Sequence, residues 1–181
     1  MSSSDLGPPY TRRTVFKGKV VDLGLEAFEL PDGRPCELEV IRHPGAAAVV
    51  PLHDDGTVTL VRQYRHAGGG MMLEIPAGIL EEGEVPELGA RRELAEETGL
   101  TTDKLRRLVI LHTTPGFTDE RIWIFLGTGL AESADGQDLD DDEYLAPERM
   151  PLVEALELID RGQITDGKTI VGLHLAARHS P

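Results

Sequence analysis

Apolar and polar residues alternate along much of the first half of the chain. From about Tyr10 to Ile41, this alternation and the Pro-Asp-Gly turn signal at 31–33 predict short strands joined by turns. Two longer apolar runs, Ala46–Leu52 and Thr57–Tyr64, flank the sequence HDDG and predict a hairpin of central strands. Further strands are predicted within 68–78, 103–112 and 120–130.

Three later segments have the composition or periodicity of helices. Pro86 suits the first turn of one helix, and Gly99 suits its C-terminal end. A second helix is predicted from Pro151 to its stop at Gly162, and a third begins near Asp166. The acidic, turn-rich residues 131–145 are predicted to be a loop. The pattern favours one mixed α/β domain, residues 43–181, preceded by a strand-rich N-terminal extension, residues 1–42.

Composition narrows the class of protein and its partners. The 181 residues are 40% hydrophobic and 28% charged, which is typical of a globular protein. A formal net charge of -14 argues against nucleic acid or an anionic membrane as partner, yet it allows a small phosphorylated substrate bridged by metal. The single cysteine, Cys36, cannot form an internal disulfide, and we interpret it as structural. With no apolar signal segment at the N-terminus and no membrane-spanning run, a cytoplasmic location is predicted.

The first predicted helix crowds carboxylates near its C-terminal end. Glu93, Glu96 and Glu97 stand at i, i+3 and i+4 and therefore share one side. The opposite, buried side is predicted to hold Leu88, Leu94, Ala95 and Thr98, with the Glu97 side chain at the surface.

Carboxylates at this position repel one another and oppose the helix dipole. One interpretation is a solvated acidic face, and the other is a site for a hard divalent cation, with Glu84 folding back from just before the helix. Because local rules are broken mostly at functional sites, the second interpretation is favoured.

The segment from Gly78 to Leu100 resembles the Nudix box, G-x5-E-x7-R-E-U-x-E-E-x-G-U, in which U is apolar. The matching positions are Gly78, Glu84, Arg92, Glu93, Leu94, Glu96, Glu97, Gly99 and Leu100. Nudix hydrolases cleave a nucleoside diphosphate linked to another group, using Mg²⁺ or Mn²⁺. The resemblance therefore implies an enzyme with an α/β/α sandwich fold and a mixed sheet.

Outside the box, residues 60–78 and Pro115 in TTPGFTDER resemble the ADP-ribose pyrophosphatase branch of that family. This resemblance implies hydrolysis of ADP-ribose to AMP and ribose 5-phosphate, and a homodimer built through the N-terminal strands. Related hydrolases of nucleotide sugars such as GDP-mannose, or of dinucleotides such as NADH, share parts of the pattern. A non-catalytic Nudix module that senses ADP-ribose is a further alternative, although such modules typically lose box glutamates.

The resemblance also implies roles for individual residues. Metal ions, roughly two or three per site, would be held by Glu93 and Glu97, assisted by Glu96, Glu84 and the backbone carbonyl of Ala77. Arg92 would pair with the box carboxylates and orient them, so that Arg92 and Glu96 also serve catalysis.

For the substrate, the resemblance points to residues on both sides of the box. Arg65 would contact phosphate, with Glu74, Pro115 and Gly116 shaping the pocket, and Arg62 is a poorer candidate.

Glu143 in the acidic loop matches the place of the general base, with Asp141 second; an ordinary solvated loop is the alternative. The aromatic residues that could stack on a base are Tyr10, Phe16, Phe28 and Tyr64, while His66 and His112 are interpreted as structural.

Overall fold

The structure is a computed structural model that describes residues 9–134, 136–138 and 144–179. It divides into two compact units: the first is Met1–Pro44 with His112–Arg121, and the second is Gly45–Leu111 with Ile122–Pro181. The inclusion of residues 112–121 in the first unit has no counterpart in the sequence-based prediction. The function of segment 1–42 as a dimerisation extension stays a prediction.

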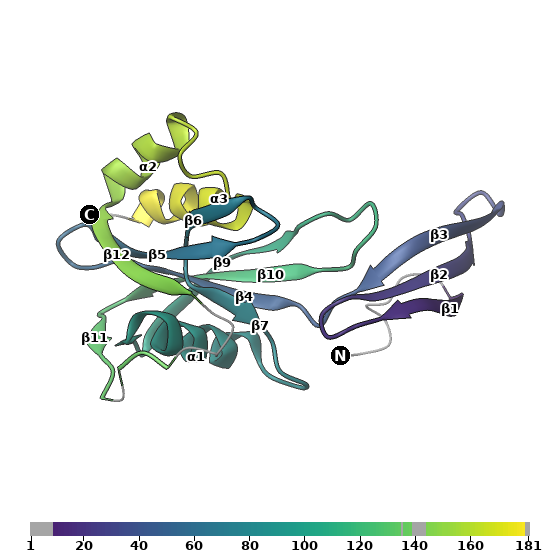
Figure 1. The fold of residues 1–181 in the computed structure, drawn as a ribbon, viewed down its shortest axis with the longest axis horizontal. Helices are drawn as coiled ribbons and strands as arrows, with labels where there is room; N and C mark the ends of the chain where they lie inside the picture. Colours follow the sequence, from purple (N-terminus) through teal and green to yellow (C-terminus); the bar gives the residue numbers. More distant parts are fainter. Residues whose placement is uncertain (1–8, 135, 139–143, 180–181) are drawn as a thin grey trace. The chain divides into compact units, whose positions relative to one another are not determined.

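The first unit is built on an antiparallel meander of three strands (Figure 1). These strands are β1 (Tyr10–Lys17), β2 (Asp22–Glu29) and β3 (Pro35–Arg42). The central strand β2 places Phe28 opposite Tyr10 of β1 and Cys36 of β3. Gly33, with a φ of 83°, makes the turn between β2 and β3 that the Pro-Asp-Gly signal predicts.

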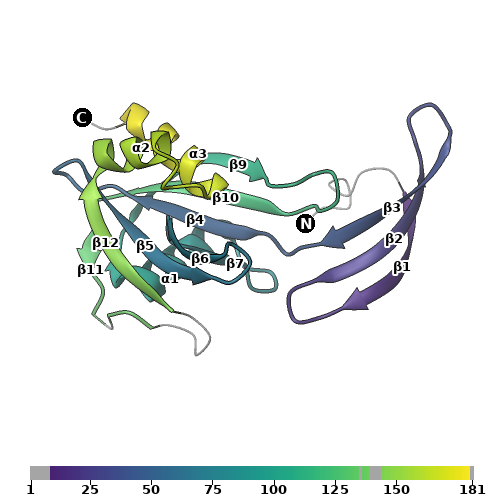
Figure 2. The same ribbon diagram turned by 45° about the horizontal axis from the view of Figure 1, so that its top comes forward.

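The second unit contains two larger sheets and three α-helices. One sheet has the order β7-β4-β10-β9, with β4 and β10 parallel, and the other has the antiparallel order β12-β5-β6. Helix α1 lies on one side of these sheets and α2 and α3 lie on the other, in both views (Figures 1 and 2). The unit therefore has the α/β/α layering that the resemblance implies.

The elements of the second unit have the following bounds. The strands are β4 (Ala46–Pro51), β5 (Thr57–Arg65), β6 (Gly70–Glu74), β7 (Ala77–Ile79), β8 (Leu100–Thr101), β9 (Lys104–His112), β10 (Arg121–Thr128), β11 (Ala131–Glu132) and β12 (Leu145–Pro151). The helices are α1 (Pro86–Thr98), α2 (Leu152–Asp160) and α3 (Gly167–Ala176), followed by a 3₁₀ turn at Ala177–His179. Within the described residues, none of the helices is long and apolar enough to cross a membrane.

Strand β4 is the centre of the core, because all six of its residues are buried. Its side chains alternate between two hydrophobic clusters. Val49 packs in the cluster with Leu94 of α1, whereas Val50 packs in the cluster with Leu173 of α3. A strand covered on both faces in this way needs apolar residues at every position, which explains its continuous apolar sequence.

The HDDG segment forms a turn but not the predicted hairpin. Gly56 has a φ of 77° in this turn, yet β4 and β5 share only the isolated bridge Leu52–Val58 and belong to different sheets. The hairpin prediction is wrong because β4 pairs with β10 along its length and with β7 over Ala46–Ala48, while β5 pairs with β12 and β6.

Strand β12 begins at the end of the predicted loop and was not expected as a strand. It contains Pro147 and Pro151, which normally argue against strand structure. The order β12-β5-β6 shows why they are tolerated: β12 is an edge strand, so prolines break no pairing with an outer neighbour.

Candidate active site

Helix α1 begins and ends where the sequence predicts. Pro86 occupies its first turn, and Gly99 ends it with a φ of 67° while its N–H donates to the Ala95 carbonyl at 2.8 Å. The helix packs on β4 and β7, so that its glutamates face the short strand that begins the box.

Two features join the helix to β7. The backbone N–H of Ala77 donates to Glu97 Oε2 at 2.9 Å. Next to it, a Cβ at Gly78 would overlap the Glu93 carboxylate. Glycine is therefore needed at the first position of the box, because the backbone of β7 approaches a carboxylate that any side chain would displace.

Arg92 gathers three further box carboxylates around one guanidinium. Its Nε donates to Glu84 Oε1 at 3.1 Å, and its Nη1 donates to Glu93 Oε1 at 2.7 Å and to Glu96 Oε2 at 2.9 Å. Its Nη2 donates to the Ile79 carbonyl at 3.2 Å and to Glu84 Oε2 at 3.1 Å. The structure thus brings Glu84, Arg92, Glu93 and Glu96 into one cluster, beside the Glu97–Ala77 contact.

The electrostatics of this cluster follow from the same contacts. The hydrogen bonds to Glu84 are the largest cause of a raised pKa for Arg92, and Glu93 and Glu96 raise it further against the opposing effect of burial. In return, the Arg92 hydrogen bond lowers the pKa of Glu84. Glu84 therefore stays ionised around neutral pH.

The predicted orientation of α1 is wrong at two positions. Leu88, predicted to be buried, is 59% exposed, whereas Glu97, predicted at the surface, is only 1% exposed, and Glu93 is 8% exposed. The buried side instead combines Ala90 and Leu94 with these two glutamates. These two glutamates face β7, where Glu97 accepts from the Ala77 N–H and the Glu93 carboxylate lies against Gly78.

The donor set suits a hard divalent cation in its chemistry. Glu97 is a buried carboxylate beside the backbone of Ala77, and Glu93 is one beside Gly78; Mg²⁺ prefers oxygen ligands of this kind. Burying this many acidic groups beside a single guanidinium is costly unless further positive charge arrives. Among the described residues, no three His, Cys, Asp or Glu side chains are already arranged to hold a metal, since Glu84, Glu93 and Glu96 are turned toward Arg92.

Arg65 and Glu74 form a second polar cluster in the same unit. Arg65 ends β5 and donates through Nε and Nη2 to the two oxygens of Glu74, at 3.0 and 2.9 Å. Glu74 is 2% exposed, and Lys168 of α3 also contacts its Oε2. Sequence reasoning missed Lys168 and Asp166, because they lie more than 90 residues from Glu74 and carry no motif.

The pKa values of Arg65 and Glu74 are shifted by their mutual contact and by neighbouring charges. Burial alone would lower the pKa of Arg65, but its hydrogen bond to Glu74 and the charges of Glu74, Glu97 and Asp166 outweigh burial and raise it. For Glu74, burial alone would raise the pKa, but Arg65 and Lys168 outweigh it and lower it. The charge of Glu97 is thus one of several that raise the pKa of Arg65.

Gln63 is a further residue that sequence reasoning missed. It precedes Arg65 by two positions on β5 and shares its side of the strand. Its Oε1 is the one buried side-chain oxygen or nitrogen without a hydrogen-bond partner in the part of the chain that the structure describes. An acceptor of this kind is normally satisfied by a water or a ligand.

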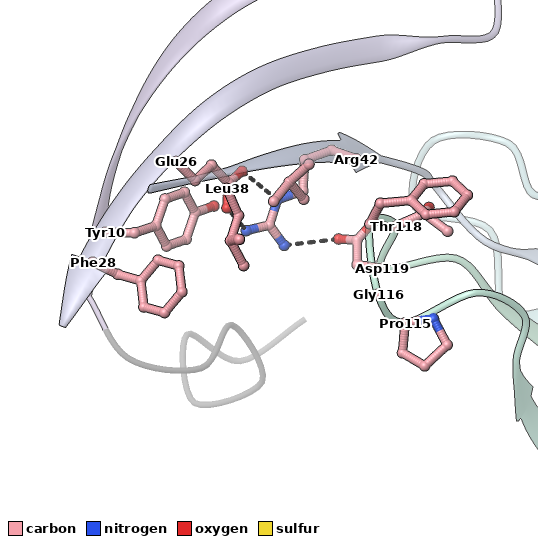
Figure 3. A pocket seen from close by; sticks show the side chains of 11 residues that line it. Tyr10, Glu26, Phe28, Leu38, Arg42, Pro115, Gly116, Thr118 and Asp119 are labelled. Atoms are coloured by element: carbon pink, nitrogen blue, oxygen red, sulfur yellow. Dashed lines mark hydrogen bonds and ion pairs between the residues drawn. The ribbon is translucent and has the colours of Figure 1, made fainter. Parts of the chain in front are cut away.

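Pro115 and Gly116 lie in the first unit, where they line a cavity of about 240 Å³ (Figure 3). The rings of Tyr10 and Phe28 line the same cavity. The other lining residues are Glu26, Leu38, Val40, Arg42, Phe117, Thr118 and Asp119.

Arg42 is the central cation of this cavity. Its guanidinium lies 4.7 Å from the centroid of the Tyr10 ring, and its Nε donates to Glu26 Oε1 at 2.8 Å while its Nη1 donates to Asp119 Oδ2 at 3.0 Å (Figure 3). Glu26 is buried and also accepts from Arg12 Nε at 3.1 Å. The hydrogen bond to Glu26 is the largest cause of a raised pKa for Arg42.

The remaining candidates are less informative. Arg62 pairs with Glu148, and Phe16 and Tyr64 are exposed. His66 contacts Tyr64, His112 ends β9, and Cys36 is partly buried in β3. Glu143 and Asp141, the candidates for the general base, lie outside the residues that the structure describes.

Comparison with known proteins identifies the family. The model of the NUDIX domain matches residues 42–170, most of the chain. An ADP-ribose pyrophosphatase of Bacillus subtilis (strain 168) is 41% identical over 87% of this chain and 85% of its own length. The methanol dehydrogenase activator of Bacillus methanolicus is 39% identical over 88% and 86%. A GDP-mannose pyrophosphatase of Yersinia enterocolitica is 34% identical over 84% and 85%.

A solved structure shows the same fold. The crystal structure of an ADP compounds hydrolase superposes with a TM-score of 0.79 and 22% sequence identity, over 95% of this chain and 93% of that chain. The chain therefore belongs to the Nudix family and is a Nudix enzyme. The predictions of that family and of its α/β/α fold are confirmed.

Proposed function

We propose that this enzyme hydrolyses the pyrophosphate bond of ADP-ribose, giving AMP and ribose 5-phosphate, in a reaction that needs Mg²⁺ or Mn²⁺. The observation that carries the proposal is the complete set of box carboxylates gathered around Arg92 and Ala77. The choice of ADP-ribose is supported by the relative of that name, which has a higher identity than the GDP-mannose pyrophosphatase.

The box residues have distinct parts in this proposal. Glu93 and Glu97, with Glu96, Glu84 and the Ala77 carbonyl, would hold roughly two or three metal ions. Bound Mg²⁺ supplies positive charge that neutralises the pyrophosphate and the charge developing on it. Arg92 lowers the pKa of Glu84 and holds Glu84, Glu93 and Glu96 together before the metal binds.

Substrate-binding roles are proposed for individual residues. Arg65 would donate to a phosphate oxygen, held in position by Glu74. Pro115 and Gly116 are proposed substrate contacts, within a cavity whose Tyr10 and Phe28 rings can stack a nucleobase. Glu143 is the proposed general base that deprotonates the attacking water, with Asp141 second.

The wider organisation follows the sequence-based predictions. Residues 43–181 are proposed as the hydrolase domain, and residues 1–42 as an extension that builds a homodimer. Exposed apolar side chains at Val15, Phe16, Val20 and Leu38 support an interface on this extension. A cytoplasmic location is expected from the single cysteine, Cys36, and the net charge of -14 argues against a nucleic-acid partner. Light scattering on the intact chain tests the dimer, and a monomeric mass at micromolar concentration contradicts it.

A hydrolysis panel tests the proposed activity. The purified chain is incubated with Mg²⁺ and ADP-ribose, GDP-mannose or NADH, and the products are separated and quantified. We expect the highest kcat/KM for ADP-ribose, with equal amounts of AMP and ribose 5-phosphate. Preferred turnover of GDP-mannose or NADH overturns the substrate. Tight ADP-ribose binding without turnover in either metal indicates a sensing module instead.

A further inference from the structure

Glu74 is an almost fully buried carboxylate with both oxygens occupied. Oε1 accepts from Arg65 Nε, and Oε2 accepts from Arg65 Nη2 and from Lys168 Nζ. The described residues engage only Nε and Nη2 of the Arg65 side chain, which is 41% exposed. Arg65 therefore has donors left for a ligand, while Glu74 fixes the plane of its guanidinium.

Lys168 is itself fixed by the start of α3. Its Nζ lies 3.1 Å from Asp166 Oδ2, and that oxygen caps the helix by accepting from the backbone N–H of Thr169 at 2.9 Å. Thr169 Oγ1 in turn donates to Asp166 and accepts from the N–H of Ile75, the residue after Glu74, at 2.9 Å. This closed ring of contacts holds Lys168 against Glu74.

The charges in this cluster show what Lys168 contributes. Arg65 and Glu74 alone would cancel, and a buried neutral pair has little attraction for a phosphate. Lys168 adds a second positive charge behind Glu74. The negative charge of Asp166 is partly offset by the N-terminus of α3, which it caps. With Asp166 counted, the four side chains sum to zero, so Lys168 acts by sharing the Glu74 carboxylate with Arg65, which leaves the charge of the exposed Arg65 less fully neutralised.

We infer that Lys168 is a positioning residue for substrate phosphate, acting through Glu74 on the charge and orientation of Arg65. The inference rests on the proposed function in so far as Arg65 is taken as the phosphate contact. Lys168 has no direct part in the chemical step.

The test compares Lys168→Met with Lys168→Arg and with Lys104→Met, a matched change of an exposed lysine at the start of β9. We expect Lys168→Met to raise KM for ADP-ribose about tenfold while kcat changes less than about twofold. Lys168→Arg should recover most of the affinity, and Lys104→Met should match the wild type. A Lys168→Met variant with a lowered melting temperature but unchanged KM overturns the inference, since it shows a purely structural role.

A double-mutant cycle separates an effect through Arg65 from a direct one. In an Arg65→Ala background, Lys168→Met should produce no further rise in KM, whereas independent, multiplying effects overturn the inference. If Lys168→Met does not fold, Lys168→Gln carries the same comparison because it removes the charge and keeps a donor.

Calorimetric binding of ADP-ribose without metal distinguishes the two proposals. A wild-type chain that binds ADP-ribose but does not hydrolyse it contradicts the proposed function alone, and Lys168→Met should still weaken its binding about tenfold. Unchanged binding by Lys168→Met contradicts the inference alone. A wild-type chain that neither binds nor hydrolyses ADP-ribose overturns both.

Discussion

Two of the clusters that pair arginine with buried carboxylates lie in different units and can be compared. In the box cluster, defined here as Glu84, Arg92, Glu93, Glu96 and Glu97, one guanidinium faces an excess of carboxylates. In the Glu26 cluster, defined as Arg12, Asp22, Glu26, Arg42 and Asp119, two guanidinium groups share three carboxylates. The contacts have similar lengths in the two clusters, but the balance of charge differs.

This difference in charge balance explains why similar hydrogen bonds stabilise a sheet in one cluster and leave excess negative charge in the other. Glu26 is satisfied by its two arginines, so its cluster is close to neutral and stabilises the three-stranded sheet of the first unit. The box cluster remains strongly negative after Arg92 has made all its hydrogen bonds. The remaining negative charge suits a divalent cation, and this imbalance, rather than the number of glutamates alone, supports the proposed metal site.

The largest expected effect comes from Glu97→Gln. Removing one buried box carboxylate should lower kcat/KM by about 10⁴-fold or more, because several kcal/mol of metal-dependent stabilisation are lost. The melting temperature should stay the same or rise, since the change removes a buried charge and keeps the acceptor for the Ala77 N–H. Steady-state kinetics across a Mg²⁺ titration check this, and activity near that of the wild type contradicts the role of Glu97 as a ligand.

Glu143→Gln tests a carboxylate proposed to act as a base rather than as a ligand. We expect kcat to fall roughly 10²–10⁴-fold with little change in the Mg²⁺ concentration needed for half-maximal rate. Asp141→Asn serves as the matched control and should keep most of the activity. An effect confined to KM, or a larger effect from Asp141→Asn, assigns the base elsewhere.

Adding Mg²⁺ should stabilise the folded chain through the box cluster and not through the Glu26 cluster. At a concentration about 100 times its dissociation constant, a metal that binds only the folded chain adds about 2.7 kcal/mol to the free energy of unfolding. We expect Glu93→Gln to lose most of this gain, whereas Glu26→Gln, although less stable at the start, should keep it. Thermal melts with and without Mg²⁺ measure both, and equal gains in the two variants contradict the contrast drawn between the clusters.

The smallest expected effect concerns pH and Glu84. Its pKa is lowered by the hydrogen bond from Arg92, so its contribution to stability is present at neutral pH and is lost as pH falls below its ordinary value of 4.5. Wild type should be more stable than Glu84→Gln by about 1 kcal/mol at pH 7, and this difference should shrink as the pH falls below 4.5. Urea unfolding across this range measures the difference, with exposed Glu82→Gln as the control. A gap that widens toward acid contradicts the assignment.

Much of the fold was predictable because its signals are local. Pro86 and Gly99 bound α1, Asp166 caps α3, and Gly33 makes the turn between β2 and β3, all as predicted. The separation of β4 and β5 into different sheets around HDDG was not predictable, because the pairing of β4 depends on distant β10. Strand β12 was hidden by its prolines, which only an edge position permits.

The candidate site likewise has features that the sequence predicts and features that it does not. Glu84, Arg92, Glu93 and Glu96 share a cluster because helical spacing and one short turn suffice to bring them together. The sequence could not show that Glu97 is buried, since the covered side of a helix depends on what packs against it.

The sequence by itself determined the chemistry of this protein: the contiguous segment from Gly78 to Leu100 carries the spacing of a Nudix box. Only the tertiary structure decided which glutamates of α1 turn inward, that Lys168 meets Glu74, and that Pro115 shares a cavity with Tyr10 and Phe28. The physical reason is the distance in sequence between the residues that interact. Periodicity fixes which residues share a face, whereas burial and charge balance are set by partners that are distant in the sequence.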